Sequence, residues 1–143
     1  MPQQFACVIL VDPRGWLLLQ ERDEHPVIDP DMWGFVGGHV DPGEEPDQAA
    51  YRELEEETGV RLEPPALPRW RVFEVFHPAY DSLDEAFVYT ARTELTDADI
   101  VCGEGRQIVF VDPSRLGDLP QTGSARLILP DFLASDRYEE LCR

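Results

Sequence analysis

A run of acidic residues between positions 37 and 60 contains the most visible chemistry of this sequence. The segment GGHVDPGEEPDQAAYRELEEETGV holds eight carboxylates and one basic residue, Arg52. Glu53, Glu56 and Glu57 are spaced by three and four residues, so on a helix they share one face. Like charges on one face repel each other and cost stability unless cations neutralise them. Carboxylate oxygens are hard donors that suit Mg²⁺ or Mn²⁺ rather than zinc or copper.

An acidic helical face has two interpretations at this point. Most such faces are simply solvated, and helix geometry alone favours solvation over a metal site. A glycine-rich stretch, VGGHVDPGE, comes directly before the helix, and its backbone could approach a ligand closely. The combination of this stretch with the acidic face at fixed spacing favours the metal site.

A helix over residues 46–58 must position these carboxylates. Pro46 suits the first helical position, and Asp47 suits the first turn because it complements the positive end of the helix dipole. Gly59 suits the position just after the last turn, where the chain must leave the helix. The sequence therefore predicts both ends of the helix that carries the acidic face.

Extended segments are predicted on both sides of this helix. The first two read as a hairpin, and Pro130 should split or kink a helical C-terminal region that begins near residue 112. The predicted strands cover residues 5–11, 16–20, 69–77, 85–92 and 107–111, and loops cover 23–32 and 64–68. Strands before and after one central helix indicate a mixed α/β sheet with helices packed on it.

Composition limits the class of protein and its partners. The 143 residues fit a single domain, 1–143, and a net charge of −17 argues against binding to nucleic-acid polymers or anionic membranes. We find no apolar window long enough for a membrane span and no secretory leader, so a cytoplasmic protein is expected. Three widely spaced cysteines suggest neither a disulfide framework nor a thiolate zinc site.

The spacing of the acidic segment resembles a known family motif. Gly38, five residues, Glu44, seven residues and RELEEETGV resemble the Nudix box, G-x5-E-x7-R-E-U-x-E-E-x-G-U, in which U is a bulky aliphatic residue. All nine defined positions match: Gly38, Glu44, Arg52, Glu53, Leu54, Glu56, Glu57, Gly59 and Val60. The box covers residues 38–60, which is 23 of the 143 residues.

The resemblance implies a fold, a reaction and a cofactor. Nudix proteins are α/β/α sandwiches with a central mixed sheet, and most hydrolyse a nucleoside diphosphate linked to another group with Mg²⁺. The implied metal ligands are Glu53, Glu56, Glu57 and the carbonyl of Gly37, and Mn²⁺ is an alternative ion. Among catalytic residues, Glu53 is the first choice as general base and Glu56 the second, while Arg52 orients the acidic cluster. Glu44, Gly38 and Gly59 would support the geometry of the loop and helix.

Two further residues are implied outside the box. Glu104 lies where some triphosphate-cleaving relatives supply another metal carboxylate, although an ordinary surface acid fits equally well. Arg22 is placed like an arginine that contacts substrate phosphate in relatives, or it pairs with Asp23 or Glu24 in solvent. His39 and His77 receive no role, since a carboxylate-rich Mg²⁺ site needs no imidazole.

The proposed partner is a small nucleotide. A nucleoside triphosphate, oxidised or not, is the first candidate, and ADP-ribose, a dinucleoside polyphosphate or a nucleotide sugar is the alternative. A ligand sensor without catalysis is the third, but such modules usually lose box glutamates that this chain keeps. Candidates for base recognition are Phe35, Phe76, Tyr80 and Phe87, each of which fits the core equally well. Relatives include homodimers, and the sequence leaves dimerisation open.

Overall fold

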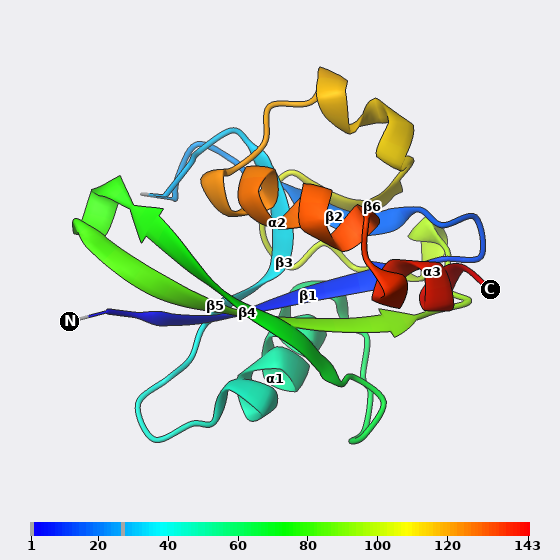
Figure 1. Cartoon of the computed structure of the whole chain (residues 1–143), viewed down its shortest axis with the longest axis horizontal. Helices are drawn as coiled ribbons and strands as arrows, with labels where there is room; N and C mark the ends of the chain where they lie inside the picture. Colours follow the sequence, from blue (N-terminus) through cyan, green and yellow to red (C-terminus); the bar gives the residue numbers. More distant parts are fainter. Residues whose placement is uncertain (1, 27) are drawn as a thin grey trace.

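A six-stranded mixed sheet with the order β4-β5-β1-β3-β2-β6 forms the centre of the protein (Figure 1). The computed structural model describes residues 2–26 and 28–143. The strands are β1 (Gln4–Val11), β2 (Leu17–Glu21), β3 (Trp33–His39), β4 (Arg69–His77), β5 (Ser82–Arg92) and β6 (Gln107–Val111). β1 and β5 run parallel, and the other neighbouring strands run antiparallel.

Helices cover both faces of this sheet (Figure 1). α1 (Pro46–Thr58) packs on one face, and α2 (Gly123–Leu133) and α3 (Asp136–Cys142) pack on the other. Short 3-10 helices cover Pro78–Tyr80, Asp97–Asp99 and Pro113–Asp118. The predicted α/β/α sandwich with a mixed sheet is confirmed. Within residues 2–26 and 28–143, every helix is too short or too polar to cross a membrane.

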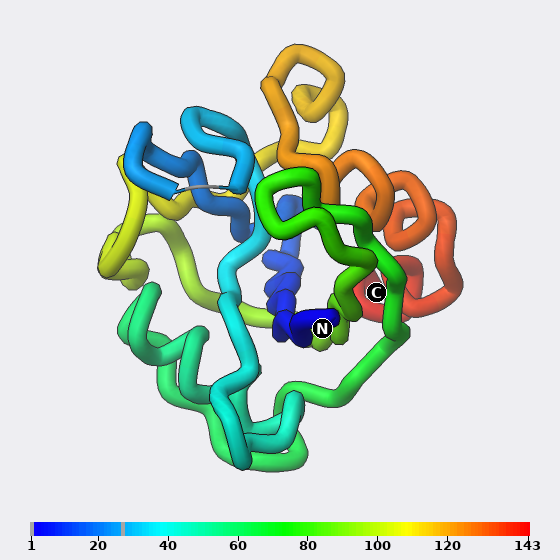
Figure 2. Tube along the Cα trace, turned by 90° about the vertical axis from the view of Figure 1, so that its left-hand side faces the viewer, coloured from blue at the N-terminus to red at the C-terminus, as the bar shows by residue number. Residues whose placement is uncertain are grey.

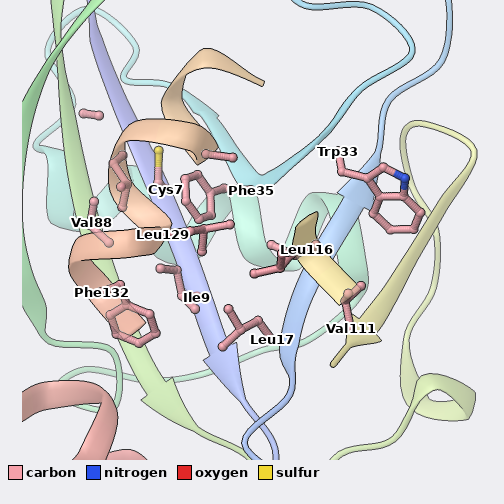
Figure 3. Packing of buried hydrophobic residues seen from close by; sticks show 14 of the residues in the cluster. Cys7, Ile9, Leu17, Trp33, Phe35, Val88, Val111, Leu116, Leu129 and Phe132 are labelled. Atoms are coloured by element: carbon pink, nitrogen blue, oxygen red, sulfur yellow. The ribbon is translucent and has the colours of Figure 1, made fainter. Parts of the chain in front are cut away.

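Alternating side chains of β1 divide the core into two layers. Cys7 and Ile9 point toward α2, while Val8 and Leu10 point toward α1. Figure 3 shows the α2 layer, in which Ile9 lies among aliphatic and aromatic side chains. Both faces of β1 are buried because helices cover both sides of the sheet, which explains its continuous apolar sequence.

The strand β3 is a correction to the sequence analysis, which predicted no strand over residues 33–39 and took the glycine-rich VGGHVDPGE only as a stretch leading into the helix. β3 lies between β1 and β2 and pairs with both, for example Val8 with Val36 and Leu19 with Phe35. Glycine is unfavourable in strands by propensity, but here close packing requires it. At Gly37, φ is 145° and a Cβ would collide with the Ala6 carbonyl oxygen.

Other element boundaries are partly as expected. The helix α1 spans Pro46–Thr58 as predicted. The predicted N-terminal hairpin is confirmed at its turn, where β1 and β2 pair antiparallel through Val11 and Leu17, but β2 pairs over more residues with β3 and β6. Pro130 does not end α2, which continues to Leu133.

Candidate functional site

The helix α1 is fixed at its apolar face and at both ends. Ala49, Ala50 and Leu54 are fully buried against the sheet. The N–H of Glu45 donates to Gln48 Oε1 over 2.9 Å at the start of the helix. The left-handed Gly59 (φ 75°) ends the helix, and its N–H donates to the carbonyl of the last turn over 2.9 Å. These contacts fix the orientation of the acidic face.

A cavity of about 510 Å³ borders this acidic face. Figure 2 looks onto the N-terminal end of β1, with α1 below and the green β4–β5 hairpin above. Glu53, Glu57 and Glu104 form what we call the acidic wall of the cavity. Phe5, His39, His77 and Tyr80 form a second group of lining residues, which we call the aromatic wall. Gly37, Gly38 and Arg22 also line the cavity.

Glu57 is the most buried carboxylate of the acidic wall, with 3% of its surface exposed. The N–H of Gly37 donates to its Oε2 over 3.1 Å, and Gln20 Nε2 donates to its Oε1 over 3.4 Å. Burial, together with the nearby charges of Glu53 and Glu104, raises the pKa of Glu57 to about 8, although the Gly37 hydrogen bond opposes this. Without a cation, this carboxylate is therefore costly to ionise.

Glu53 lies beside Gly38 with 14% of its side chain exposed. Burial raises the pKa of Glu53, and the adjacent Arg52 partly opposes that shift. A Cβ on Gly38 would lie 2.7 Å from Glu53 Oε1, so only glycine leaves room for the carboxylate in this position. The box glycine thus acts by direct contact with a box glutamate.

Glu56 is the most exposed of the three box glutamates, with 57% of its side chain accessible. It lies outside the cavity lining and accepts from Arg52 Nη1 over 3.1 Å. Glu53, Glu56 and Glu57 do not bring one oxygen each within 4.8 Å of the others. In the described ranges only an Asp23, Glu24 and His25 group does so. Arg52 Nη1 donates to both Glu53 and Glu56, whereas Glu57 is held by Gly37 and Gln20.

Arg52 connects the helix to the preceding loop. Its Nε and Nη2 donate to the two carboxylate oxygens of Glu44 over 2.8 and 2.9 Å, and its Nη1 donates to Glu53 over 3.0 Å. Its Nη2 also donates to the carbonyl of His39 over 3.1 Å. These hydrogen bonds lower the pKa of Glu44 and raise the pKa of Arg52 above its usual value. Arg52 therefore stays charged and holds loop and helix together.

Glu104 reaches the cavity because its loop is attached to the end of α1. The N–H of Gly103 donates to the Glu57 carbonyl over 2.7 Å, and a Cβ at Gly103 would lie 2.5 Å from the Glu56 carbonyl oxygen. Gln20 Nε2 donates to the Glu104 carbonyl over 2.9 Å. The structure thus brings Glu104 together with Glu53 and Glu57 across about fifty residues of chain.

Arg22 lines the cavity with a buried Nε that has no hydrogen-bond partner among residues 2–26 and 28–143. Burying an unpaired guanidinium nitrogen is unfavourable, so this atom indicates a missing polar partner. The expected alternative, an ion pair with Asp23 or Glu24, is not formed by Arg22 in this part of the chain. Arg106 pairs with Glu24 instead, at 3.3 Å, and with Asp31 at 2.6 Å.

The donor set fits a hard divalent cation. The oxygens near the cavity come from Glu53, Glu57 and Glu104, with Glu56 beside them on α1. Hard cations such as Mg²⁺ prefer such oxygen donors. Burial, as the main cause, raises the pKa of Glu53 and of Glu57, so both carboxylates are costly to ionise without a cation nearby. The Asp23, Glu24 and His25 group is more exposed, and exposed acids are common without an ion.

The aromatic wall contains residues that the sequence analysis missed. His39 and His77 were assigned no role, and Phe5 was read only as part of a strand, but all three line the cavity. Their strand positions gave no signal, because sheet pairing decides which strand ends meet. Among the four candidates for base recognition, Phe35 and Tyr80 line the cavity.

The other two candidates for base recognition do not line the cavity. Phe87 is buried in the layer under α1, and Phe76 is 54% exposed on the edge strand β4.

Comparison with known proteins gives a family model that matches most of the chain and curated relatives that match less than half of it. The model of the NUDIX domain matches residues 1–132. A Bacillus subtilis (strain 168) protein named "Putative 8-oxo-dGTP diphosphatase" is 42% identical over 59 residues, 41% of this chain and 36% of that protein. Nucleoside triphosphatase NudI of Enterobacter sp. (strain 638) is 36% identical over 65 residues, 46% of this chain and 45% of that protein. The chain thus spans less than half the length of these curated relatives.

A solved structure matches the fold over nearly the full length of both chains. The MutT protein from Methanosarcina mazei Go1 superposes with a TM-score of 0.71 at 20% identity, covering 97% of this chain and 94% of that chain. At this level of identity the similarity concerns the fold. It agrees with the sandwich and the mixed sheet described above.

Proposed function

This chain belongs to the Nudix family, and from that premise we propose that it hydrolyses a phosphoanhydride bond in a nucleoside diphosphate linked to another group. The proposed substrate is a nucleoside triphosphate, oxidised or not, with the nucleoside monophosphate and pyrophosphate as products. The observation that carries the proposal is the acidic wall, in which Glu53 and Glu57 are at least partly buried and have a raised pKa, beside a cavity that Arg22 also lines.

The cofactor in this proposal is Mg²⁺, with Mn²⁺ as a substitute. Glu53, Glu56, Glu57 and Glu104 would hold it, together with the carbonyl of Gly37. Such an ion, when bound, neutralises phosphate oxygens and lowers the pKa of an attacking water. A protein with a net charge of −17 would otherwise repel a polyphosphate.

Glu53 is the proposed general base. It lines the cavity, and its pKa is raised by burial toward the range in which a carboxylate accepts and releases protons near neutrality. Glu56 is the second choice, but its side chain is more exposed and lies outside the cavity lining. The proton of the attacking water would pass to a Glu53 oxygen.

Arg52 and Arg22 have different roles in this proposal. Arg52 touches Glu44, Glu53 and Glu56 and positions the carboxylates without contacting substrate. Arg22 would place its unpartnered Nε against a phosphate oxygen. Guanidinium groups suit phosphate because they donate several hydrogen bonds in a fixed geometry.

The names of the two curated relatives support a triphosphate substrate. One is named as an 8-oxo-dGTP diphosphatase and the other as a nucleoside triphosphatase. Their matched segments cover less than half of each protein, so the substrate is tested directly. The test compares nucleoside triphosphates, oxidised triphosphates, ADP-ribose, nucleotide sugars and dinucleoside polyphosphates.

The experiment separates each compound from its phosphorylated products by chromatography, after incubation with Mg²⁺, with Mn²⁺ and with a chelator. We expect turnover with the metal ions, loss of turnover with the chelator, and loss in Glu53→Gln and Glu57→Gln. Glu63→Gln is the matched control, because that carboxylate is exposed and forms its ion pair with Arg61. Wild-type turnover in both active-site variants would contradict the site, and inactivity on every compound would favour a ligand sensor.

A further inference from the structure

The aromatic wall gathers four ring side chains from distant parts of the chain. The Phe5 ring lies 4.3 Å from the His39 ring and 5.0 Å from the His77 ring, measured between centroids. Tyr80 lies 6.1 Å from His39 and 6.4 Å from His77. All four residues line the cavity that the acidic wall borders. Flat conjugated ligands bind to such ring surfaces by stacking.

A buried carboxylate fixes the orientation of His77. Asp84 is fully buried, and its Oδ2 lies 2.6 Å from His77 Nδ1. Its Oδ1 accepts from the N–H of Gln3 over 2.7 Å and from Ser82 Oγ over 2.6 Å. Burial alone would raise the pKa of Asp84, but these hydrogen bonds and His77 hold it below its usual value. Asp84 is therefore an acceptor only.

This arrangement determines which nitrogen of His77 carries the proton. Because ionised Asp84 only accepts, His77 Nδ1 must donate to it. In the neutral imidazole the other nitrogen, Nε2, is then an acceptor. Within residues 2–26 and 28–143, the only hydrogen bond of the His77 ring is the one between Nδ1 and Asp84. Nε2 is consequently the ring atom that a ligand in the cavity can use.

His39 is tied to the same network through Gln3. Its Nε2 lies 2.7 Å from Gln3 Oε1, while the backbone N–H of Gln3 donates to Asp84. Gln3, which directly precedes β1, thus contacts His39 itself and the Asp84 carboxylate that supports His77. Hydrogen bonds with Gln3 and Asp84 hold the His39 and His77 rings in place, and the Phe5 ring contacts both of them.

We propose that the aromatic wall is the nucleobase subsite of this cavity, in which His77 Nε2 accepts a hydrogen bond from an exocyclic amino group and Asp84 sets the tautomer that makes this contact. The inference rests on the proposed function, since it assigns the base of the same nucleotide substrate. It predicts a preference for adenine and cytosine over hypoxanthine and uracil, which carry a carbonyl at the corresponding position. His77 would contact the substrate, and Asp84 would be a positioning residue.

The test uses nucleotide pairs that differ in this single group. Equilibrium binding of AMP against IMP, and of CMP against UMP, is measured by calorimetry in the presence of Mg²⁺. We expect the wild-type protein to favour the amino-bearing member by about tenfold, as for one buried hydrogen bond. The kcat/KM of the corresponding triphosphates should show the same order.

Two substitutions separate base recognition from a structural role. In Asp84→Asn, the amide donates to His77 Nδ1, so that Nε2 carries the proton and the preference should shift toward the carbonyl-bearing nucleotides. In His77→Phe, stacking remains and the preference should fall to about one, as expected when a single hydrogen bond is lost. Asp131→Asn is the control for the carboxylate, because Asp131 is about half exposed on α2. Thermal melting verifies that each variant folds.

The outcomes distinguish this inference from the proposed function. Turnover of all triphosphates with no preference between paired bases, and no shift in His77→Phe, would overturn the base subsite and leave the hydrolase standing. An amino preference in binding that both substitutions alter would support the subsite even if hydrolysis were absent. If Asp84→Asn fails to fold, His77→Phe alone decides, and an unchanged preference in that variant overturns the inference.

Discussion

The acidic wall and the aromatic wall line one cavity but are stabilised in opposite ways. The acidic wall places carboxylates near one another, and burial raises the pKa of Glu53 and Glu57. Next to the aromatic wall, the buried Asp84 accepts hydrogen bonds from Gln3, Ser82 and the wall residue His77. These hydrogen bonds hold the pKa of Asp84 below its usual value. A bound cation would favour ionisation of the first arrangement, whereas hydrogen bonds already stabilise the ionised carboxylate of the second.

The difference shows how burial acts on similar groups. Both Glu57 and Asp84 are buried carboxylates, yet only Asp84 accepts hydrogen bonds from three short contacts. At Glu57, desolvation has the larger effect and raises the pKa, because this carboxylate accepts fewer and longer hydrogen bonds, of 3.1 and 3.4 Å. We therefore expect substitutions in the acidic wall to affect turnover, and substitutions behind the aromatic wall to affect stability and base preference.

The largest expected effect is that of Glu57→Gln on turnover. The amide keeps the size of the side chain but removes a charge that would hold the cation. We expect kcat to fall by about 10²–10⁴-fold, while the melting temperature without metal stays unchanged or rises. The measurement is turnover at saturating Mg²⁺ together with thermal melting in chelator. A large loss of stability with unchanged turnover in Glu57→Gln would contradict this prediction, because Glu57 would then support the fold and not catalysis.

Arg52→Lys should have the next largest effect. Lysine cannot donate to both oxygens of Glu44 and to Glu53 at once. We expect the apparent Mg²⁺ affinity or the activity to fall by about 10–100-fold, as is typical when a residue that orients metal ligands is lost. Arg61→Lys is the control, because Arg61 forms an exposed pair with Glu63. Equal effects of Arg52→Lys and Arg61→Lys would show that Arg52 has no specific role in the site.

Arg22→Gln tests whether Arg22, which lines the cavity together with the acidic wall, binds the substrate. If Nε contacts a substrate phosphate, KM should rise by about tenfold with a smaller change in kcat, because a hydrogen bond to a charged group is lost. Arg61→Gln is the control, since that arginine is exposed and pairs with Glu63 away from the cavity lining. An unchanged KM in Arg22→Gln would indicate that the buried nitrogen has no substrate partner.

Asp84→Asn should affect stability in a pH-dependent manner. Because the folded protein lowers the pKa of Asp84, its ionised form stabilises the fold above the unfolded pKa of about 3.9. We expect a cost of about 1–2 kcal/mol at neutral pH, and this cost should shrink as the pH falls through the lowered pKa. Urea unfolding of wild type and variant across this range gives the difference. A cost that grows at low pH would contradict the assignment.

The smallest effect is expected for Glu55→Gln. Glu55 occupies the variable position of the box, is exposed on α1 and lies outside the cavity lining. Turnover should change by less than about twofold, and stability by less than about 0.5 kcal/mol. The comparison with Glu57→Gln under the same conditions tests whether position on the helix, rather than total charge, decides the effect. A comparable loss in both variants would favour total charge.

The sequence predicted the acidic wall better than the aromatic wall. Along one helix, spacing fixes relative position, so the shared side of Glu53, Glu56 and Glu57 follows from the 3.6-residue period. Ligand roles and the distance between the carboxylates do not follow from that period. Glu56 is more exposed than its neighbours, and the three oxygens do not converge.

The aromatic wall could not be assembled from sequence. His39, His77 and Asp84 lie on three strands, and a shift of one residue in any register would turn their side chains to the opposite face. The sequence analysis predicted no strand over residues 33–39, and β3, the strand that carries His39, was therefore missed. Glycine has low strand propensity, and only pairing with β1 and β2 makes Gly37 suitable there.

The sequence by itself determined the helix α1, the residues on its acidic face and the α/β class, because each depends on local spacing and on the order of elements. Tertiary structure decided that Glu104 joins the acidic wall, that Arg22 keeps a buried nitrogen without a described partner, and that two histidines share the cavity. These features depend on strand register and on loops attached by long-range hydrogen bonds, such as that from Gly103 to Glu57. Such contacts follow from the packed sheet and not from neighbours in the chain.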